Sequence, residues 1–341
     1  MRNRYRSLLA ESLSAPSVDT LLKRLLPDWV TVFMLHRFSV PDLGVEGMEP
    51  TFLANCLESL RKDGCQFLSL EEAVVRASEN RLGRQKWAVF SLDDGCFEQV
   101  EVAGEVFALY DCPATCFLIT DYIDGKLWEW EHQLMWLTQQ LKSEECPQIS
   151  LEYDGANIIF DLKLEKPYKQ IVAWIRRTNP SDAYNLVQRI GTAAGIPIPP
   201  KPPPQYRPAS WDAIRGMEKR GMNFAPHTVT HRIVSGLNDE ELEQEVVGSI
   251  ARVNAECAQA APIFCYPSGK FGEYDQRIVE LLQREGVLAS FIAEPGYMNG
   301  PRLRKQNDYR YLIPRMTIPD DIGKLRRYVS SAQFLRELLV S

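Results

Sequence analysis

Two adjacent carboxylates, Asp93 and Asp94, end the apolar run Trp87-Ala-Val-Phe-Ser-Leu and are followed by Gly95. This pattern predicts a buried strand that delivers both acids at its C-terminal end. A carboxylate removed from water stays ionised only beside a cation, a metal or several hydrogen-bond donors. We therefore expect a positive centre next to these two aspartates. The alternative is a plain strand end with an Asp-Gly turn.

A second pair of chemically capable side chains, His227 and His231, is separated by three residues, and the chain has only four histidines. On one helical turn this spacing points both imidazoles the same way. Two histidines and one carboxylate commonly hold a catalytic metal with open positions for water and substrate. The pair alone also fits surface or capping histidines. Beside an acidic strand end, it favours a metal site.

The elements that must position these residues alternate between strand and helix. Strands are predicted at 30–35, 66–68, 87–94, 114–119, 222–226, 262–266, 288–292 and 311–315. Such alternation indicates an α/β fold, a deformed (β/α) barrel of about seven parallel strands. The C-terminal strand ends of such a barrel form one face. The polar residues at these ends should converge there: His36, Asp93, Asp94, His227 and Arg315.

The alternation is interrupted in the middle of the chain. A helix at 127–141, a hairpin around Asp154-Gly155 and two further helical stretches are predicted, and the proline-rich segment 196–208 returns as a stiff connector. We predict an N-terminal helical region at 1–28, a barrel formed by 29–123 and 209–341, and an inserted α+β subdomain at 124–208.

The N-terminal region contains an amphipathic stretch at residues 20–26. Its leucines are flanked by Arg2, Arg4, Arg6, Lys23 and Arg24. Such a helix could make a peripheral contact with a membrane surface. Packing against the main body is the interpretation that we favour.

Composition limits the partners. The formal net charge is −6 without a block of basic residues, so nucleic acid is not expected, whereas an uncharged or cationic substrate is easier to accept. Residues 1–10 lack the apolar core and cleavage site of a signal peptide, and no apolar run is long enough to cross a membrane. The eight cysteines form no CxxC pair, which favours reduced core thiols and a cytoplasmic protein.

Three motifs resemble those of a known family, the polysaccharide deacetylases (NodB-like, carbohydrate esterase family four). Ser91-Leu-Asp-Asp-Gly95 resembles the first motif, usually Thr-Phe-Asp-Asp-Gly. His227-Thr-Val-Thr-His231 matches the second motif, and Phe264-Cys-Tyr-Pro-Ser-Gly269 is similar to the third. The resemblance spans roughly residues 30–320.

The resemblance implies a deformed (β/α) barrel with a divalent metal, commonly zinc, held by Asp94, His227 and His231. Asp93 would be the general base in the hydrolysis of an N-acetyl group from an amino sugar of a glycan. The division of roles is reasonable because successive strand side chains point to opposite sides, so one aspartate can bind the metal while the other faces the attacking water. A barrel that only binds a glycan is the alternative, but a binding module does not need all four residues.

The sequence departs from the family pattern in two places. The third motif lacks the arginine that often orients the base, and Arg315 could replace it. No histidine follows His231 to act as the late general acid. Some branches of the family look circularly permuted, and the strand ending at His36 would then supply that acid. A histidine hydrogen-bonded at the barrel rim is the alternative for His36.

Several aromatic residues are candidates for sugar contact. The third motif places Tyr266, Pro267 and Gly269 at the substrate, with the backbone N–H near Tyr266 as a possible oxyanion donor, and Phe271 and Tyr274 lie close by. Trp128, Trp130 and Trp136 recur at helical spacing with leucines, which favours core packing over a stacking platform. His132 is expected to be at the surface or hydrogen-bonded.

Overall fold

The computed structural model of the chain describes residues 16–143 and 146–340. The basic residues Arg2, Arg4 and Arg6 of the predicted N-terminal region lie outside them. No helix within the described ranges is both long and apolar enough to cross a bilayer.

The strands form one main sheet and two smaller ones. The main sheet contains β1 (Trp29–Leu35), β2 (Cys65–Phe67), β3 (Lys86–Asp94), β4 (Ala114–Leu118), β7 (Asn223–Pro226), β10 (Met298–Asn299) and β11 (Met316–Thr317). A parallel pair consists of β8 (Ile263–Cys265) and β9 (Ala289–Phe291), and a hairpin consists of β5 (Gln148–Tyr153) and β6 (Ala156–Asp161). In the main sheet β3 lies between β1 and β4, β7 follows β4, and all of these pairs are parallel.

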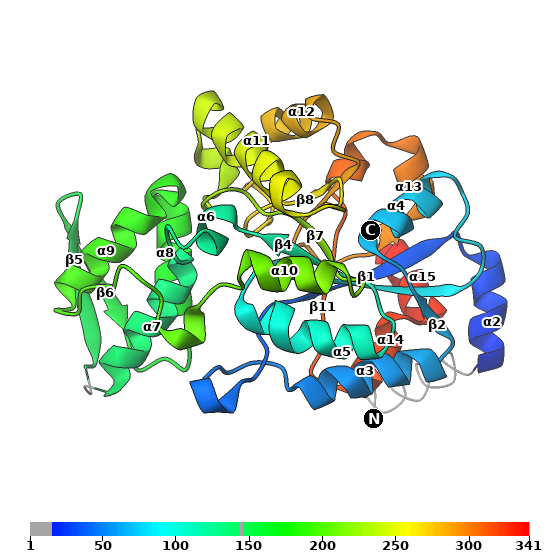
Figure 1. Ribbon diagram of the computed structural model, residues 1–341, viewed down its shortest axis with the longest axis horizontal. Helices are drawn as coiled ribbons and strands as arrows, with labels where there is room; N and C mark the ends of the chain where they lie inside the picture. The colour runs from blue at the N-terminus through cyan, green and yellow to red at the C-terminus, as the bar shows by residue number, and fades with distance from the viewer. Residues whose placement is uncertain (1–15, 144–145, 341) are drawn as a thin grey trace.

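Helices cover the outside of this sheet (Figure 1). The α-helices of the described residues are α2 (Pro16–Leu25), α3 (Pro50–Lys62), α4 (Leu70–Ser78), α5 (Gly104–Leu109), α6 (Thr120–Ile123), α7 (Trp130–Ser143), α8 (Tyr168–Thr178), α9 (Ala183–Ala193), α10 (Trp211–Glu218), α11 (Asp239–Glu256), α12 (Gln276–Arg284), α13 (Gly300–Lys305), α14 (Ile322–Tyr328) and α15 (Ser331–Val340), of which α7, α8 and α9 lie beside the sheet. The alternation of strand and helix confirms the predicted deformed α/β barrel.

Local sequence accounts for the edges of several elements. Every residue of β1 is buried, as expected for a strand covered on both faces. Ser210 caps α10 by accepting the N–H of Ala213, as predicted, and Asn238 with Glu241 forms a capping box at the start of α11. Asp154 and Gly155 both have positive φ, which suits the two-residue turn of the β5–β6 hairpin.

The barrel is closed by the segment around residues 311–317, for which the sequence-based strand prediction was wrong. The predicted strand 311–315 is not formed: Tyr311 ends a 3₁₀ turn, Ile313 makes a single bridge to Phe291, and β11 pairs with β1. The segment therefore crosses from β9 to β1 instead of extending along one neighbour. Pro314, which lacks an N–H, cannot continue a ladder at this point.

The elements between α6 and α10 gather at one side of the barrel (Figure 1). They are α7, the β5–β6 hairpin, α8 and α9. Their apolar residues belong to the same hydrophobic cluster as β1, α3 and β4, so this part of the chain shares a core with the barrel. The predicted helix 127–141 begins only at Trp130, because Glu129 caps it with its carboxylate, which accepts the His132 N–H at 2.8 Å.

Helix α2 packs against the main body through a buried aspartate. The two carboxylate oxygens of Asp19 accept the N–H of Ser331 at 2.7 Å and pair with Lys86 at 2.6 Å, which joins α2 to α15 and β3. The side chains of Leu21 and Leu25 remain exposed on the other face. The packing interpretation of this helix is therefore correct.

Candidate functional site

The ends of three parallel strands bring the predicted site residues together. Asp93 and Asp94 end β3, His36 follows β1, and His227 follows β7. His36 Nε2 lies 3.9 Å from Asp93 Oδ2, and His227 Nε2 lies 3.9 Å from Asp94 Oδ1. The two aspartates and His227 are buried, whereas about half of the His36 side chain is exposed.

Arg315 compensates the charge of Asp93. Its Nη1 and Nη2 donate to the two Asp93 oxygens at 2.7 and 2.8 Å. The other donors of the guanidinium bind the carbonyl of Ile292, the hydroxyl of Ser91 and the sulfur of Cys265, so all five N–H groups are used. Burial alone would raise the pKa of Asp93, but the charge and hydrogen bonds of Arg315 leave that pKa well below its usual value.

Asp94 has no such cation. No lysine or arginine of the described residues forms an ion pair with Asp94, and His227 and His231 approach its Oδ1 with their Nε2 atoms. Burial, followed by the charges of Glu129 and Asp93, raises the pKa of Asp94 well above its usual value. An ionised Asp94 therefore needs a further positive centre. Its φ of 92° also marks backbone strain at this residue.

The two histidines turn their Nε2 atoms toward Asp94. His227 Nδ1 lies 2.8 Å from the carbonyl of Cys265, and His231 Nδ1 lies 3.1 Å from Glu129 Oε1. Because both partners are acceptors, each Nδ1 carries the proton and each Nε2 keeps its lone pair. Burial lowers the pKa of His227 to about 3 and that of His231 to about 4, so both imidazoles are neutral.

The spacing of these atoms fits a metal. Asp94 Oδ1 lies 3.9 Å from His227 Nε2 and 3.6 Å from His231 Nε2. Two ligands roughly 2.1 Å from one tetrahedral zinc would be roughly 3.4 Å apart. The three side chains form a possible ligand group in which the ligand atoms lie within 4.8 Å of one another. Small side-chain adjustments would therefore bring all three to bonding distance.

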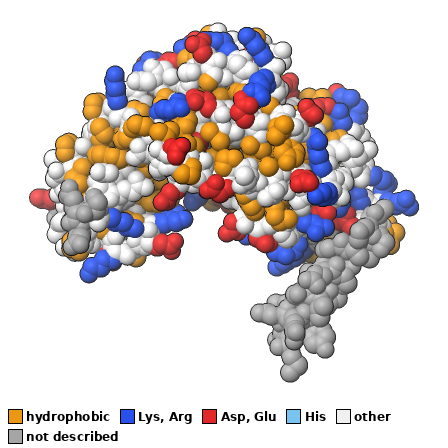
Figure 2. All heavy atoms as spheres, turned by 60° about the horizontal axis from the view of Figure 1, so that its bottom comes forward, with side chains coloured by type: hydrophobic (Ala, Val, Ile, Leu, Met, Phe, Trp, Pro, Cys, Tyr) orange, Lys and Arg blue, Asp and Glu red, His pale blue; other side chains and the backbone are white. Residues whose placement is uncertain are grey.

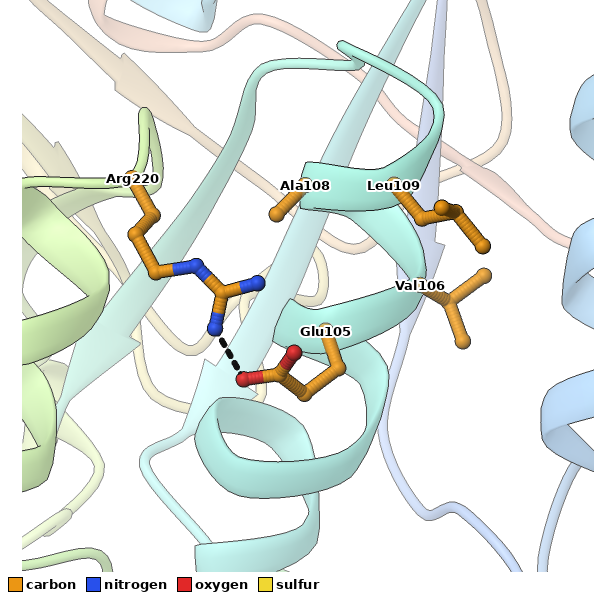
Figure 3. A pocket seen from close by; sticks show the side chains of 5 residues that line it. All are labelled: Glu105, Val106, Ala108, Leu109 and Arg220. Atoms are coloured by element: carbon orange, nitrogen blue, oxygen red, sulfur yellow. Dashed lines mark hydrogen bonds and ion pairs between the residues drawn. The ribbon is translucent and has the colours of Figure 1, made fainter.

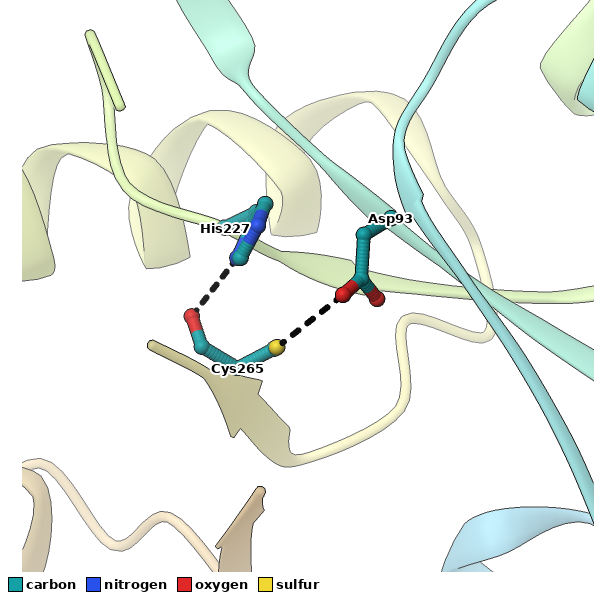
Figure 4. A group of neighbouring side chains, drawn as sticks. All are labelled: Asp93, His227 and Cys265. Carbon is teal, nitrogen blue, oxygen red and sulfur yellow. Dashed lines mark hydrogen bonds between the residues drawn. The ribbon is translucent and has the colours of Figure 1, made fainter. Parts of the chain in front are cut away.

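Asp93, His227 and Cys265 also lie close together (Figure 4). The Cys265 thiol is 3.9 Å from Asp93 Oδ2, and the backbone carbonyl of Cys265 accepts a hydrogen bond from His227 Nδ1. The guanidinium of Arg315 already binds Asp93 and the Cys265 sulfur. The charge of Asp93 in this group is therefore already compensated by Arg315, whereas the charge of Asp94 is not.

The helical turn expected for His227–His231 is wrong. The segment is a loop in which Thr228 and His231 have φ values of 67° and 61°, and this bend places the two imidazole centroids 4.8 Å apart. Positive φ is unfavourable for a β-branched residue such as Thr228. Glu245 on α11 braces the loop by accepting the N–H groups of Val229 and Thr230 at 2.9 and 2.8 Å.

Glu129 was not predicted from the sequence. It is buried just before α7, and its carboxylate accepts from both the His132 N–H and His231 Nδ1. Burial raises the pKa of Glu129 to about 7. The only signal in the sequence was an acid between two tryptophans, Trp128 and Trp130, both of which are buried. Its partner is 102 residues away in the chain.

Gln99 joins the two strand ends that carry Asp93 and His36. It lies at the start of a π-helical turn (Gln99–Ala103), a feature often found at functional sites. Its amide nitrogen donates to the carbonyls of His36 and Asp93, and its oxygen accepts the N–H groups of Gly95 and Cys96. The buried amide therefore fixes the backbone on both sides of the carboxylate pair.

Most residues of the third motif are buried. Tyr266 is 1% exposed, its hydroxyl donates to the Tyr311 carbonyl at 2.9 Å and its N–H donates to the Phe291 carbonyl. The Tyr266 side chain is therefore buried away from solvent, its hydroxyl holds the 3₁₀ turn at Tyr311 and its N–H holds the end of β9, whereas a substrate contact or an oxyanion donor near Tyr266 stays a prediction. Pro267 and Gly269 are buried too, and their contact with substrate stays a prediction. Phe271, by contrast, is 90% exposed.

The region between α6 and α10 contacts the third motif through Arg176 on α8. Its Nη2 donates to Ser268 Oγ and to Glu131 Oε1, both at 2.6 Å. Ser268 lies in the motif and has a φ of 59°. This region therefore forms a wall of the site and supplies Glu129 to it.

The surface of the molecule is uneven. Figure 2 shows one face with a hollowed edge, along which both acidic and basic side chains lie. A separate hollow of about 410 Å³ is lined by Glu105, Val106, Ala108, Leu109 and Arg220 (Figure 3). That hollow contains a single ion pair, between Arg220 and Glu105, and shares no residue with the carboxylate cluster.

Comparisons with known proteins agree with this geometry. The chain is similar to the structure of the Streptococcus pyogenes deacetylase PplD in complex with acetate, with 17% identity, 91% of this chain and 98% of that chain covered, and a TM-score of 0.54. The chain is also similar to the de-N-acetylase from Aggregatibacter actinomycetemcomitans, with 12% identity and a TM-score of 0.55. The match covers 88% of this chain and 100% of that one. IcaB from Ammonifex degensii is 13% identical, with a TM-score of 0.52, and the match covers 89% of this chain and 97% of that one. These likenesses show a shared fold.

No curated protein sequence matches the chain. A family model described as polysaccharide deacetylase matches residues 81–290, which is more than half of the chain. The matched stretch includes the two aspartates and the two histidines of the site. The chain therefore belongs to the polysaccharide deacetylase family, the hydrolase class that its three motifs indicated.

Proposed function

We propose that the protein is a metal-dependent hydrolase that removes N-acetyl groups from amino sugars of a polysaccharide or glycan precursor. Asp94, His227 and His231 would hold a divalent metal, with zinc as our choice because one carboxylate and two neutral imidazoles suit it. The supporting observation is the difference between the two aspartates. Asp93 has a cation bound to both of its oxygens, whereas Asp94, also buried, is paired with no lysine or arginine in the described ranges and has two neutral histidines next to its Oδ1.

The bound metal would polarise the amide carbonyl and acidify the attacking water. The protein's own residues would handle the protons. Asp93 is held ionised by Arg315 and so can accept the proton that the water loses. His36, with Nε2 3.9 Å from Asp93 Oδ2, is placed to give a proton to the leaving amine nitrogen. Acetate and the free amino sugar would then leave.

The formal net charge of −6 favours a neutral or cationic glycan as the substrate, because it would repel a strongly anionic chain. Acetate, the acid that such a reaction releases, is bound in the S. pyogenes structure. A glycan-binding protein without catalysis would not need a base, its guanidinium and three metal ligands in contact, so we favour the enzyme.

We also propose a cytoplasmic location, supported by eight free cysteines.

The first prediction separates the two aspartates. Asp94→Ala, His227→Ala and His231→Ala should each lose the metal held by these three ligands and lose activity with it, because each removes one ligand of that site. Asp93→Asn should keep its metal and lose turnover by the ~10²–10⁴-fold typical of general-base removal. Metal content by mass spectrometry and acetate release are measured on the same samples. Equal loss of metal in the Asp93 and Asp94 variants would contradict these roles.

The second prediction concerns Arg315. Because this guanidinium holds the pKa of Asp93 low, Arg315→Met should raise it, and the acidic limb of the pH–rate profile should move to higher pH. The matched control is Arg304→Met, which removes another bidentate pair, with Asp28, outside the cluster. The control should leave the acidic limb in place. An unmoved limb in a folded Arg315→Met protein would remove Arg315 from the site.

The third prediction concerns His36 as the general acid. His36→Ala should keep its metal and lose most amide hydrolysis, since the leaving amine needs a proton. Hydrolysis of an activated ester, whose leaving group needs none, should be largely spared. If both substrates suffer equally, His36 is not the acid, and if metal is lost, it supports the metal instead.

The fourth prediction concerns Glu129, which orients His231. Glu129→Gln keeps an acceptor but removes the charge, so metal affinity should fall by the ~10–100-fold seen when such supporting groups are changed. Glu131→Gln is the control, because that carboxylate bonds Arg176 instead of a histidine. Competition with a fluorescent chelator gives both dissociation constants. Similar values for the two variants would contradict the orienting role.

A further inference from the structure

A second group of ligand-type side chains lies beside Asp94. Asp94, Cys96 and His132 are all buried, and they offer one ligand atom each within 4.8 Å of one another. Cys96 follows the carboxylate pair by two residues, and His132 comes from α7. Carboxylate, thiolate and imidazole are the three donor types of transition-metal sites.

His132 does not behave as the sequence predicted. It is only 5% exposed, and its Nδ1 has no hydrogen-bond partner among residues 16–143 and 146–340. Its imidazole packs 5.4 Å from the ring of Tyr206 and 6.5 Å from that of Tyr122. A buried imidazole nitrogen without a partner is costly, so a missing ligand is the simplest explanation for its position.

The surroundings of Cys96 are suited to a cation. Among the described residues, its sulfur accepts one weak hydrogen bond, from the Tyr122 hydroxyl at 3.8 Å. The charges of Glu98 and Asp94 act on it together with that of Arg37, so carboxylates outnumber the guanidinium. Glu98 is fully buried, and its Oε2 lacks a hydrogen-bond partner in the described part of the chain. Arg37 is already bound to Glu98 and to the Gln205 carbonyl.

We propose that Asp94, Cys96 and His132 form a second divalent-metal site that shares Asp94 with the first one. A carboxylate has two oxygens and can bind one ion with each, as in two-metal hydrolase sites. The thiolate selects a borderline or soft ion such as zinc or cobalt over magnesium or calcium. When the ion binds, the Cys96 thiol gives its proton to solvent and sulfur donates the freed electron pair to the metal.

Cobalt titration tests this site independently of activity. Reduced full-length protein, stripped of metal with a chelator, is titrated with Co²⁺ alone and followed by absorption. We expect two equivalents to bind, one of them giving the near-ultraviolet band of a cobalt–thiolate bond. Cys96→Ser should lose that band and one equivalent, and His132→Gln should lose one equivalent. The controls Cys116→Ser and Cys265→Ser, which change other buried thiols, should keep both.

The outcomes separate this site from the first. His231→Ala should lose the other equivalent and keep the thiolate band. One equivalent without a thiolate band would overturn the second site and leave the proposed function intact, whereas no binding at all would overturn both. A band lost in Cys265→Ser instead of Cys96→Ser would also contradict the assignment.

X-ray absorption of zinc-loaded wild-type protein covers the case in which the Cys96 variant does not fold. A sulfur neighbour at ~2.3 Å from zinc supports the site. Its absence at saturating zinc overturns it.

Discussion

The structure depends on how two adjacent carboxylates remain buried at the end of β3. At Asp93 the negative charge is compensated by Arg315, whose five N–H groups all have hydrogen-bond acceptors. Removing Arg315 would leave an uncompensated buried charge, a loss of ~3–5 kcal/mol in comparable pairs. At Asp94 the negative charge is not compensated in this way, because the two imidazoles that face it are neutral. This difference between the two aspartates is what supports the proposed roles, with Asp93 as the proton acceptor and Asp94 as a metal ligand.

Barrel closure and the site are built from the same segment. The chain crosses from β9 to β1 through residues 313–317, and Arg315 lies in this crossing. The arginine contacts the end of β9 through the Ile292 carbonyl and β3 through Ser91. The opposite wall comes from the region between α6 and α10, which contributes Glu129 and Arg176. A barrel without either part would lack the counterion of Asp93 or the carboxylate that binds His231.

Strand ends were readable from the sequence because apolar runs that stop at a polar residue have one simple interpretation. His36, Asp93 and His227 all lie where that pattern placed them. The loop at 227–231 was misjudged because HxxxH spacing does not reveal the positive φ of Thr228 and His231, nor the hydrogen bonds from the loop to Glu245 on the following helix. Glu129 was missed for a similar reason, since its role exists only after α7 packs beside the histidines. The burial of Tyr266 likewise depends on contacts with distant residues, such as Phe291 and Tyr311, which the spacing of apolar residues in the sequence does not reveal.

Anomalous diffraction from crystals grown with zinc would test the central claim directly. Data collected on either side of the zinc absorption edge locate the ion without reference to activity. The account predicts a peak at bonding distance from Asp94 and from Nε2 of His227 and His231, with Arg315 still on both oxygens of Asp93. A peak bonded to Asp93 in place of Arg315, or no peak near Asp94 at saturating zinc, would contradict it.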